Sequence, residues 1–150
     1  MKFILFQTVF CVMRFSKLFY KMNISTLSLF LIFVGGALGS IVRFLFSKWI
    51  ITPSIDFPTA TFVTNFLACV ILGILASYLG EAKQESEKLL AALFMTGFCG
   101  GFSTFSTLNL ETFKLIQAQN YQIAFFYTFS NVILGFVAIA IGFWFVGLFK

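Results

Sequence analysis

A cluster of glycines and hydroxyl side chains lies inside an otherwise apolar part of this chain. Residues 97–107 read Gly-Phe-Cys-Gly-Gly-Phe-Ser-Thr-Phe-Ser-Thr. Lipid offers no hydrogen bonds, so a membrane span must bury such groups against protein or use them along an aqueous pathway. The cluster predicts a helix that is interrupted at membrane depth, with freed backbone groups directed inward. Interrupted helices of this kind bind ions and substrates in transporters.

Two side chains in or near this cluster have chemistry suited to an ion site. The ring edge of Phe105 carries the positive end of the aromatic quadrupole, so a ring turned edge-on can face an anion. Glu111 is the only acid far from a loop, and it lies four residues after Thr107 on the same helical face. Glu111 either accepts a hydrogen bond from that hydroxyl or is an interfacial acid near the end of the span.

Polar pairs with a spacing of four residues occur in two other apolar stretches. Thr61 and Asn65 share one helical face, and Tyr127 and Asn131 share another. An amide offers two N–H donors, as a desolvated anion requires, but it also serves to bond two helices together. The two stripes either line one path past the cluster or make separate hydrogen bonds between helices.

The first apolar stretch combines small residues with an arginine. Gly35, Gly36 and Gly39 have a spacing that lets a partner backbone approach closely. Arg43 follows roughly sixteen residues into the stretch. An arginine at that depth costs several kcal/mol unless it finds water, headgroups or a partner. Arg43 either snorkels to the membrane surface or has a functional role.

The composition predicts the elements that must position these residues. The chain has 150 residues, of which 60% are hydrophobic and 10% are charged. This balance is typical of an integral membrane protein. About 20 apolar residues cross the hydrocarbon of a bilayer. We therefore predict an all-α integral membrane protein with four transmembrane helices, the third of them broken, at residues 27–50, 58–80, 88–113 and 122–149.

Several function classes are excluded by what the sequence lacks. There is no histidine, the commonest general base and transition-metal ligand, so we expect no redox or metal enzyme and no enzyme activity. Cys11, Cys69 and Cys99 lack the paired spacing of a disulfide or zinc site. The net charge of +5 comes from basic residues before Met22 or beside the spans, so we expect no nucleic-acid partner.

The segment before the first span is a doubtful leader. Lys2 is followed by about eleven mostly apolar residues, as in a signal peptide, but no small-residue cleavage site follows. We expect either a true start at Met22 or a basic helix lying along the membrane surface. Residues 1–22 are accordingly set apart from the four-helix membrane domain at residues 23–150.

The charges beside the spans do not dictate an orientation. With four spans, both termini and the 81–88 loop lie on one side of the membrane. Leaving out the leader, the two sides carry nearly equal numbers of lysines, namely Lys83, Lys88 and Lys150 against Lys48 and Lys114. A small protein without charge bias can insert both ways, so two copies would form an antiparallel dimer with a two-fold axis in the membrane plane.

These motifs together resemble the CrcB/Fluc family of fluoride channels, from about residue 28 to the end of the chain. Residues 35–43 resemble the family's first-span Gly-Gly-x-x-Gly-x-x-x-Arg pattern. Residues 58–73 resemble its second-span Pro-x-Gly-Thr-x-x-x-Asn pattern, and residues 97–111 resemble its third-span signature. The resemblance implies passive fluoride efflux across the cell's inner (plasma) membrane, which lowers cytoplasmic fluoride and protects against its toxicity.

The resemblance also implies an assembly and a set of site residues. Family members form antiparallel dual-topology dimers with two fluoride pathways, and here the backbone carbonyls of Gly100 and Ser103 match those that hold a central structural sodium ion. The fluoride pathway is implied to follow amide, hydroxyl and aromatic side chains: Thr61, Asn65, Phe105, Ser106, Thr107, Tyr127 and Asn131. The residues implied to support the pore are Arg43, Gly101, Leu108 and Glu111.

Several positions depart from the family pattern. Leu108 stands where a second pore phenylalanine is typical, and Asn131 stands where a small hydroxyl residue is typical. Ala60 replaces a glycine, and Ala68 with Cys69 replaces a Gly-Ser pair. The departures are compatible with a homodimer of altered conductance or anion affinity, or with a heterodimer that includes a related subunit.

Two other function classes fit the size and the four spans. A proton-coupled exporter similar to small multidrug transporters would need a carboxylate at mid-membrane, whereas Glu111 lies near a span end. A non-transporting membrane subunit would show no ion flux and would have a stable foreign partner. Release of fluoride from liposomes separates all three classes.

Overall fold

The computed structural model describes residues 26–50, 57–79 and 84–148. The doubtful leader at residues 1–22 lies outside the described residues, as do Lys83 and Lys150 from the charge count. The described residues are helical apart from short connections, and they contain four helical runs long and apolar enough to cross a membrane. The prediction of an all-helical chain with four membrane-capable helices is confirmed.

The helical runs follow the predicted spans closely. They are α2 (Thr26–Trp49), α3 (Thr59–Leu79), a third run over Glu85–Gln117, and α7 (Tyr121–Gly147). The third run contains α4 (Glu85–Leu90), the π-helical segment η1 (Ala91–Cys99), α5 (Gly100–Phe102) and α6 (Phe105–Gln117). It is longer than the predicted span because its charged first and last turns are also helical.

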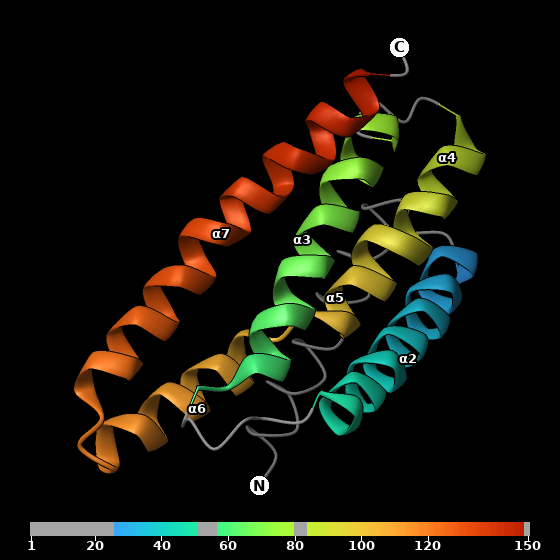
Figure 1. Ribbon diagram of the computed structural model, residues 1–150. Coiled ribbons are helices and arrows are strands. Elements are labelled where there is room, and N and C mark those ends of the chain that lie inside the picture. The colour runs from blue at the N-terminus through green and yellow to red at the C-terminus, as the bar shows by residue number, and fades with distance from the viewer. Residues whose placement is uncertain (1–25, 51–56, 80–83, 149–150) are drawn as a thin grey trace, which may run out of the picture.

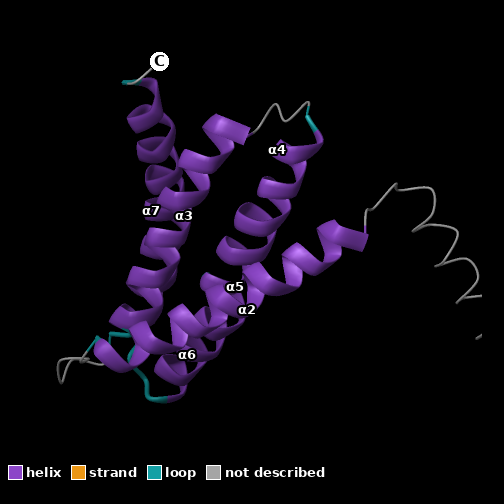
Figure 2. Cartoon of the chain, turned by 90° about the vertical axis from the view of Figure 1, so that its right-hand side faces the viewer, coloured by secondary structure: helices purple, strands orange, loops and turns teal. Residues whose placement is uncertain are grey.

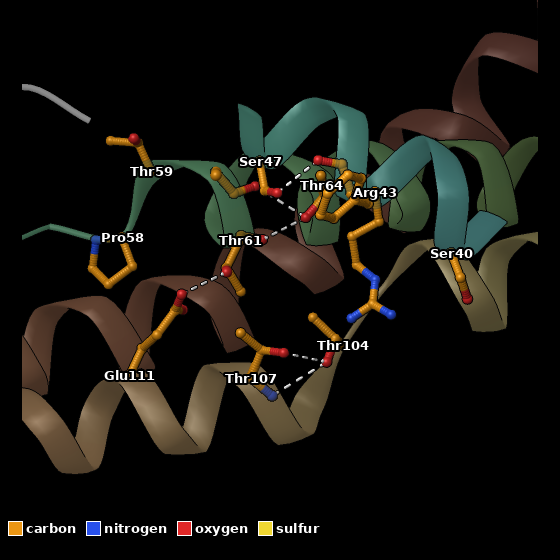
Figure 3. A pocket seen from close by; sticks show the side chains of 12 residues that line it. Ser40, Arg43, Ser47, Pro58, Thr59, Thr61, Thr64, Thr104, Thr107 and Glu111 are labelled. Atoms are coloured by element: carbon orange, nitrogen blue, oxygen red, sulfur yellow. Dashed lines mark hydrogen bonds between the residues drawn. The ribbon is translucent and has the colours of Figure 1, made fainter. Parts of the chain in front are cut away.

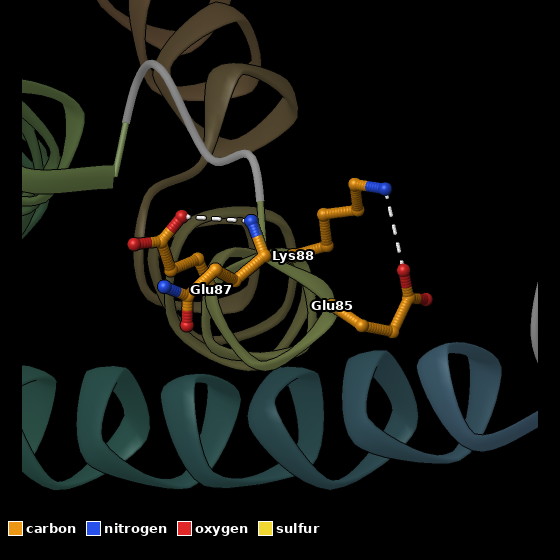
Figure 4. Close-up of polar contacts among 4 residues, drawn as sticks. Glu85, Glu87 and Lys88 are labelled. Atoms are coloured by element: carbon orange, nitrogen blue, oxygen red, sulfur yellow. Dashed lines mark hydrogen bonds and ion pairs between the residues drawn. The ribbon is translucent and has the colours of Figure 1, made fainter.

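The charged start of α4 is stabilised by its own side chains. The Gln84 N–H donates to Glu87 Oε2 at 3.1 Å, which satisfies a backbone donor that the helix itself leaves free. Lys88 Nζ forms an exposed ion pair with Glu85 Oε2 at 3.2 Å (Figure 4). Acidic residues in the first turn also complement the positive end of the helix dipole.

The helices pack as two pairs. α3 packs chiefly along α7, and α2 packs chiefly along η1 and α5 (Figure 1). α6 leaves the line of α5 and packs against the first part of α7 (Figure 2). The cluster of Leu108, Leu115, Ala124 and Tyr127 is the buried contact between α6 and α7. This arrangement brings polar residues of all four helical runs toward the end of α5.

Glycines make the close contact between α2 and the third run. A methyl group on Gly35 would overlap the carbonyl oxygen of Leu93, and one on Gly39 would overlap the carbonyl oxygen of Phe98. A methyl group on Gly101 would overlap the carbonyl oxygen of Gly36. The predicted packing role of the first-span glycines is therefore confirmed, and Gly101 is part of the same contact.

Two extended residues separate α5 from α6. Ser103 has φ −82° and ψ 160°, and Thr104 has φ −153° and ψ 114°. Gly100 has the helical values φ −63° and ψ −37°. The glycine pair thus continues the helix, with Gly101 packed against α2 and Gly100 exposed, while the irregular backbone lies at the two hydroxyl residues that follow.

Candidate functional site

A polar cavity of about 430 Å³ lies among α2, α3 and α6 (Figure 3). Its walls carry one guanidinium, one carboxylate and several hydroxyl groups. The lining residues are Ser40, Arg43, Phe44, Ser47, Pro58, Thr59, Ala60, Thr61, Thr64, Thr104, Thr107 and Glu111. A space of this size and polarity holds water molecules.

Two residues that line the cavity carry unpaired polar atoms. Among the described residues, Arg43 Nε and Thr59 Oγ1 are the buried side-chain polar atoms that have no hydrogen-bond partner, and both residues line this cavity. Buried polar groups in folded proteins are almost always bonded to protein or to water. Arg43 extends into the cavity (Figure 3), so its guanidinium brings a positive charge to the cavity wall.

Glu111 joins three helices through its carboxylate. The Thr61 hydroxyl of α3 donates to Oε1 at 3.0 Å, and the Tyr127 hydroxyl of α7 donates to Oε2 at 2.6 Å. The prediction that Glu111 accepts from Thr107 is wrong, because the carboxylate reaches across to the two neighbouring helices. The Thr107 hydroxyl instead accepts from Thr104 Oγ1 at 3.0 Å.

Asn65 binds the irregular backbone between α5 and α6. Its Oδ1 accepts from the Thr104 N–H at 2.8 Å, and its Nδ2 donates to the Thr104 carbonyl at 3.4 Å. Thr104 in turn caps α6, because its hydroxyl accepts from the Thr107 N–H at 3.2 Å. A side chain of α3 therefore satisfies backbone groups that the extended conformation of Thr104 leaves free.

This bonding frees two carbonyl groups. In a continuous helix the Thr104 N–H would donate to the Gly100 carbonyl, and the Thr107 N–H would donate to the Ser103 carbonyl. Here Asn65 accepts from the first N–H and Thr104 Oγ1 accepts from the second. The Gly100 and Ser103 carbonyls thus lose these helical donors.

The two predicted polar stripes face each other across α3 and α7. The Asn65 Nδ2 donates to Asn131 Oδ1 at 3.2 Å, and the Asn131 Nδ2 donates to the Tyr127 carbonyl at 2.9 Å. Thr61 and Tyr127 are joined through Glu111. The stripes therefore make hydrogen bonds between helices, and Asn65 links them to the irregular backbone; whether they also line one path stays a prediction.

A second, smaller cavity of about 200 Å³ lies on the other side of Thr104. Its lining residues are Asn65, Cys69, Ser103, Thr104, Phe105, Leu108, Asn131 and Val132. Thr104 is the one residue that lines both cavities. Phe105 is 73% exposed, whereas Leu108 is only 3% exposed and packs against Tyr127.

The structure brings most of the predicted site residues to these two cavities. Ser106 is exposed, but its hydroxyl lies 3.2 Å from Thr104 Oγ1. The sequence interpretation missed Thr104 as a site residue, together with Ser40, Ser47 and Thr64 of the polar cavity. The spacing of Ser40, Arg43 and Ser47 at i, i+3 and i+7 was a usable signal, because it places all three on one helical face.

Comparison with known proteins identifies the family. Residues 30–143, about three quarters of the chain, match the family described as CrcB-like protein, Camphor Resistance (CrcB). The chain belongs to the CrcB family. The matched CrcB region contains the irregular residues and every side chain that lines either cavity. This CrcB chain is therefore a multi-pass membrane protein.

Relatives in other organisms share this region of the CrcB chain. The protein named fluoride-specific ion channel FluC in Azobacteroides pseudotrichonymphae is 40% identical over 116 residues, which cover 77% of this chain and 92% of the relative. The protein of the same name in Ignicoccus hospitalis is 46% identical over 110 residues, which cover 73% and 86%. That in Flavobacterium psychrophilum is 38% identical over 115 residues, which cover 74% and 90%.

Proposed function

We propose that this chain is a fluoride-specific ion channel that lets fluoride leave the cell passively through its inner (plasma) membrane and so protects against fluoride toxicity. The relatives named as fluoride-specific ion channels support this function. The observation that carries it is the junction at Thr104, where a polar cavity lined by Arg43 and several hydroxyl groups meets a smaller cavity containing an amide and an exposed phenyl ring.

The polar cavity is the entrance of the proposed path. Arg43 supplies a positive charge there. The Glu111 carboxylate already accepts hydrogen bonds from Thr61 and Tyr127. These bonds partly compensate its negative charge, so it repels an entering anion less. Hydrated fluoride would exchange water for the hydroxyl groups of this cavity one at a time.

The junction is where dehydration would be completed. Thr104, Ser106 and Thr107 form a connected group of hydroxyls at the start of α6. Asn65 contributes amide donors, and the Phe105 ring offers its electropositive edge on the far side. Fixed donors of this kind replace the hydration shell of a small, strongly hydrated anion.

Efflux along this path needs no coupled energy source. An interior-negative membrane potential contributes about 2.3 kcal/mol per charge per 100 mV, and its sign drives an anion outward. A passive channel therefore lowers cytoplasmic fluoride as long as the cell maintains its potential. This distinguishes the channel from a proton-coupled exporter, which would require a pH gradient.

The proposed path requires a second copy of the chain, or a related subunit, in the antiparallel orientation. In one chain Phe105 is 73% exposed at the edge of the smaller cavity, so that cavity lacks a wall. Gly100 is also exposed, and no atom lies within 4 Å of the position that its Cβ would take. A partner packed at Gly100 and Phe105 would close the path and remove both residues from lipid.

A structural sodium ion at the centre of that dimer is part of the same proposal. The Gly100 and Ser103 carbonyls have lost their helical donors to Asn65 and Thr104. Unwound backbone carbonyls and the negative ends of short helices are the groups that coordinate sodium in membrane proteins. The donor set thus fits a sodium ion whose role is to hold the two subunits together.

Fluoride release from liposomes tests the function. Purified protein is reconstituted in vesicles loaded with potassium fluoride, and valinomycin balances the charge without a pH gradient. We expect rapid fluoride release and at least a hundredfold slower chloride release, an energy difference of about 2.7 kcal/mol. Equal release of both anions, or no release, would contradict the proposal. Asn65→Ala should slow release, whereas Asn109→Ala, at an exposed asparagine of α6, should not.

A further inference from the structure

The orientation of the Asn131 amide is fixed by the backbone of its own helix. Its Nδ2 donates to the Tyr127 carbonyl at 2.9 Å, and a carbonyl can only accept. The Asn131 Oδ1 must therefore point the other way, toward α3. There it accepts from the Asn65 Nδ2 at 3.2 Å.

The orientation of Asn65 is fixed in the same manner from the other side. Its Oδ1 accepts from the Thr104 N–H at 2.8 Å, and a backbone N–H can only donate. The Asn65 Nδ2 therefore faces Asn131 and the Thr104 carbonyl, and neither amide can be reversed without losing a bond to the backbone. The polar groups of α7, α3 and the α5–α6 connection thus form one oriented chain of hydrogen bonds.

Both amide hydrogens of Asn65 are engaged within the protein. They are directed at Asn131 Oδ1 at 3.2 Å and at the Thr104 carbonyl at 3.4 Å. These distances lie at or beyond the long end of the usual N–H···O range. Such bonds are long enough to be exchanged for a stronger bond to an anion, which carries a full negative charge.

We propose that Asn131 is a positioning residue that orients the Asn65 amide and competes with the anion for it. This inference rests on the proposed fluoride conduction. An anion in the smaller cavity can bind the Asn65 Nδ2 only as one of these two bonds is given up, and the Asn131 Oδ1, as a side-chain acceptor, can move aside where the backbone carbonyl of Thr104 cannot. Asn131 thereby lowers the affinity of the site for fluoride, which favours release of the ion over its retention and so sustains flow through the path.

Two variants separate competition from simple support of the fold. Asn131→Ser keeps a hydroxyl that can bond the Tyr127 carbonyl, but its oxygen is too short to reach Asn65. Asn131→Leu keeps the number and branching of the side-chain heavy atoms, removes both bonds and suits a membrane helix. Asn109→Ser is the matched control, because Asn109 is exposed and lines neither cavity.

The measurement is the fluoride concentration that gives half-maximal release from liposomes, together with the maximal rate. We expect both Asn131 variants to lower the half-saturating concentration about three- to tenfold, the effect of losing one competing hydrogen bond. Asn109→Ser should leave it unchanged. A residue that only supports the fold would change the maximal rate and not the half-saturating concentration. An unchanged or raised half-saturating concentration would overturn the inference.

A second measurement needs no variant. In protein labelled with ¹⁵N at asparagine, fluoride should shift the side-chain amide signals of Asn65 and Asn131 at the same concentration, because the bond between them is exchanged. A shift of the Asn65 signals alone, or no shift in a protein that conducts fluoride, would contradict the competition. Absence of fluoride flux through the unmodified chain would instead contradict the proposed function itself.

Discussion

Glu111 illustrates how a charged side chain is accommodated inside this bundle. A carboxylate within a membrane domain is costly unless hydrogen bonds compensate for its lost hydration. Here Tyr127 donates to it at 2.6 Å and Thr61 donates at 3.0 Å. Tyr127 is completely buried, so its hydroxyl has no water as an alternative partner. The carboxylate and the tyrosine therefore depend on each other.

Tyr127→Phe tests this dependence. The substitution removes only the hydroxyl, so it deletes the bond to Glu111 while keeping the ring in the α6–α7 contact. Loss of a buried hydrogen bond to a charged group should lower the free energy of unfolding by about 1.5–3 kcal/mol. Denaturation of the purified protein in detergent measures this change.

Tyr121→Phe provides the control for that experiment. Tyr121 is 60% exposed at the start of α7, and a surface substitution of this kind should change stability by about 0.5 kcal/mol or less. Equal losses in the two variants would contradict the proposed role of the Tyr127 hydroxyl.

Individual site residues were predictable where a helical face decides which side chains lie together. The spacing of Thr61 with Asn65 and of Tyr127 with Asn131 was sufficient for that purpose. The partner of Glu111 was predicted wrongly, because contacts across helices depend on packing that the spacing within one helix does not contain. Thr104 was missed as a site residue, although serine and threonine before a helix are common N-caps.

The third helical run is the element whose details the sequence predicted least well. Its apolar length and its glycine and hydroxyl cluster were visible, but the extended residues are Ser103 and Thr104 rather than the glycine pair. Gly101 packs against α2 instead, a choice made by tertiary contact rather than by local preference. The π-helical segment η1 had no recognised signal in the sequence.

Gly39→Ala tests the contact between α2 and the third run. The added methyl group would overlap the backbone carbonyl oxygen of Phe98, and backbone cannot move aside as a flexible side chain can. We expect a loss of about 1–3 kcal/mol in the free energy of unfolding.

The control at the element scale is Gly147→Ala. No atom lies within 4 Å of the position that a Cβ on Gly147 would take. Alanine favours a helix over glycine by about 1 kcal/mol or less, so this variant should be unchanged or slightly more stable. A Gly39→Ala protein as stable as the Gly147→Ala protein would show that the α2 contact is looser than described.

At the scale of the whole molecule, the hydrophobic fraction and the lengths of the apolar stretches were enough to predict a four-span helical protein, because together they leave few alternatives. The pairing of helices was not predictable, since all four spans are apolar on most of their surface. Neither the sequence nor the structure of a single chain shows a second copy directly. It is proposed because the nearly balanced charges allow both orientations and because Phe105 and Gly100 are exposed in one chain.

Gly100→Ala tests the proposed dimer. The methyl group would meet nothing within the chain, so helicity measured by circular dichroism should be retained. If two copies approach closely at this residue, the variant should shift from dimer to monomer in light scattering of the detergent-solubilised protein. A variant that remains as dimeric as Gly147→Ala would contradict contact at Gly100.

The central claim is that the chain forms a passive path selective for fluoride, and a reversal potential tests it most directly. Purified protein in a planar bilayer is placed between solutions that differ tenfold in fluoride, with chloride balanced on both sides and no pH gradient. A fluoride-selective path predicts zero current at about 59 mV, the value for one electrical charge and a tenfold gradient. Zero current near 0 mV, or no current, would contradict the account.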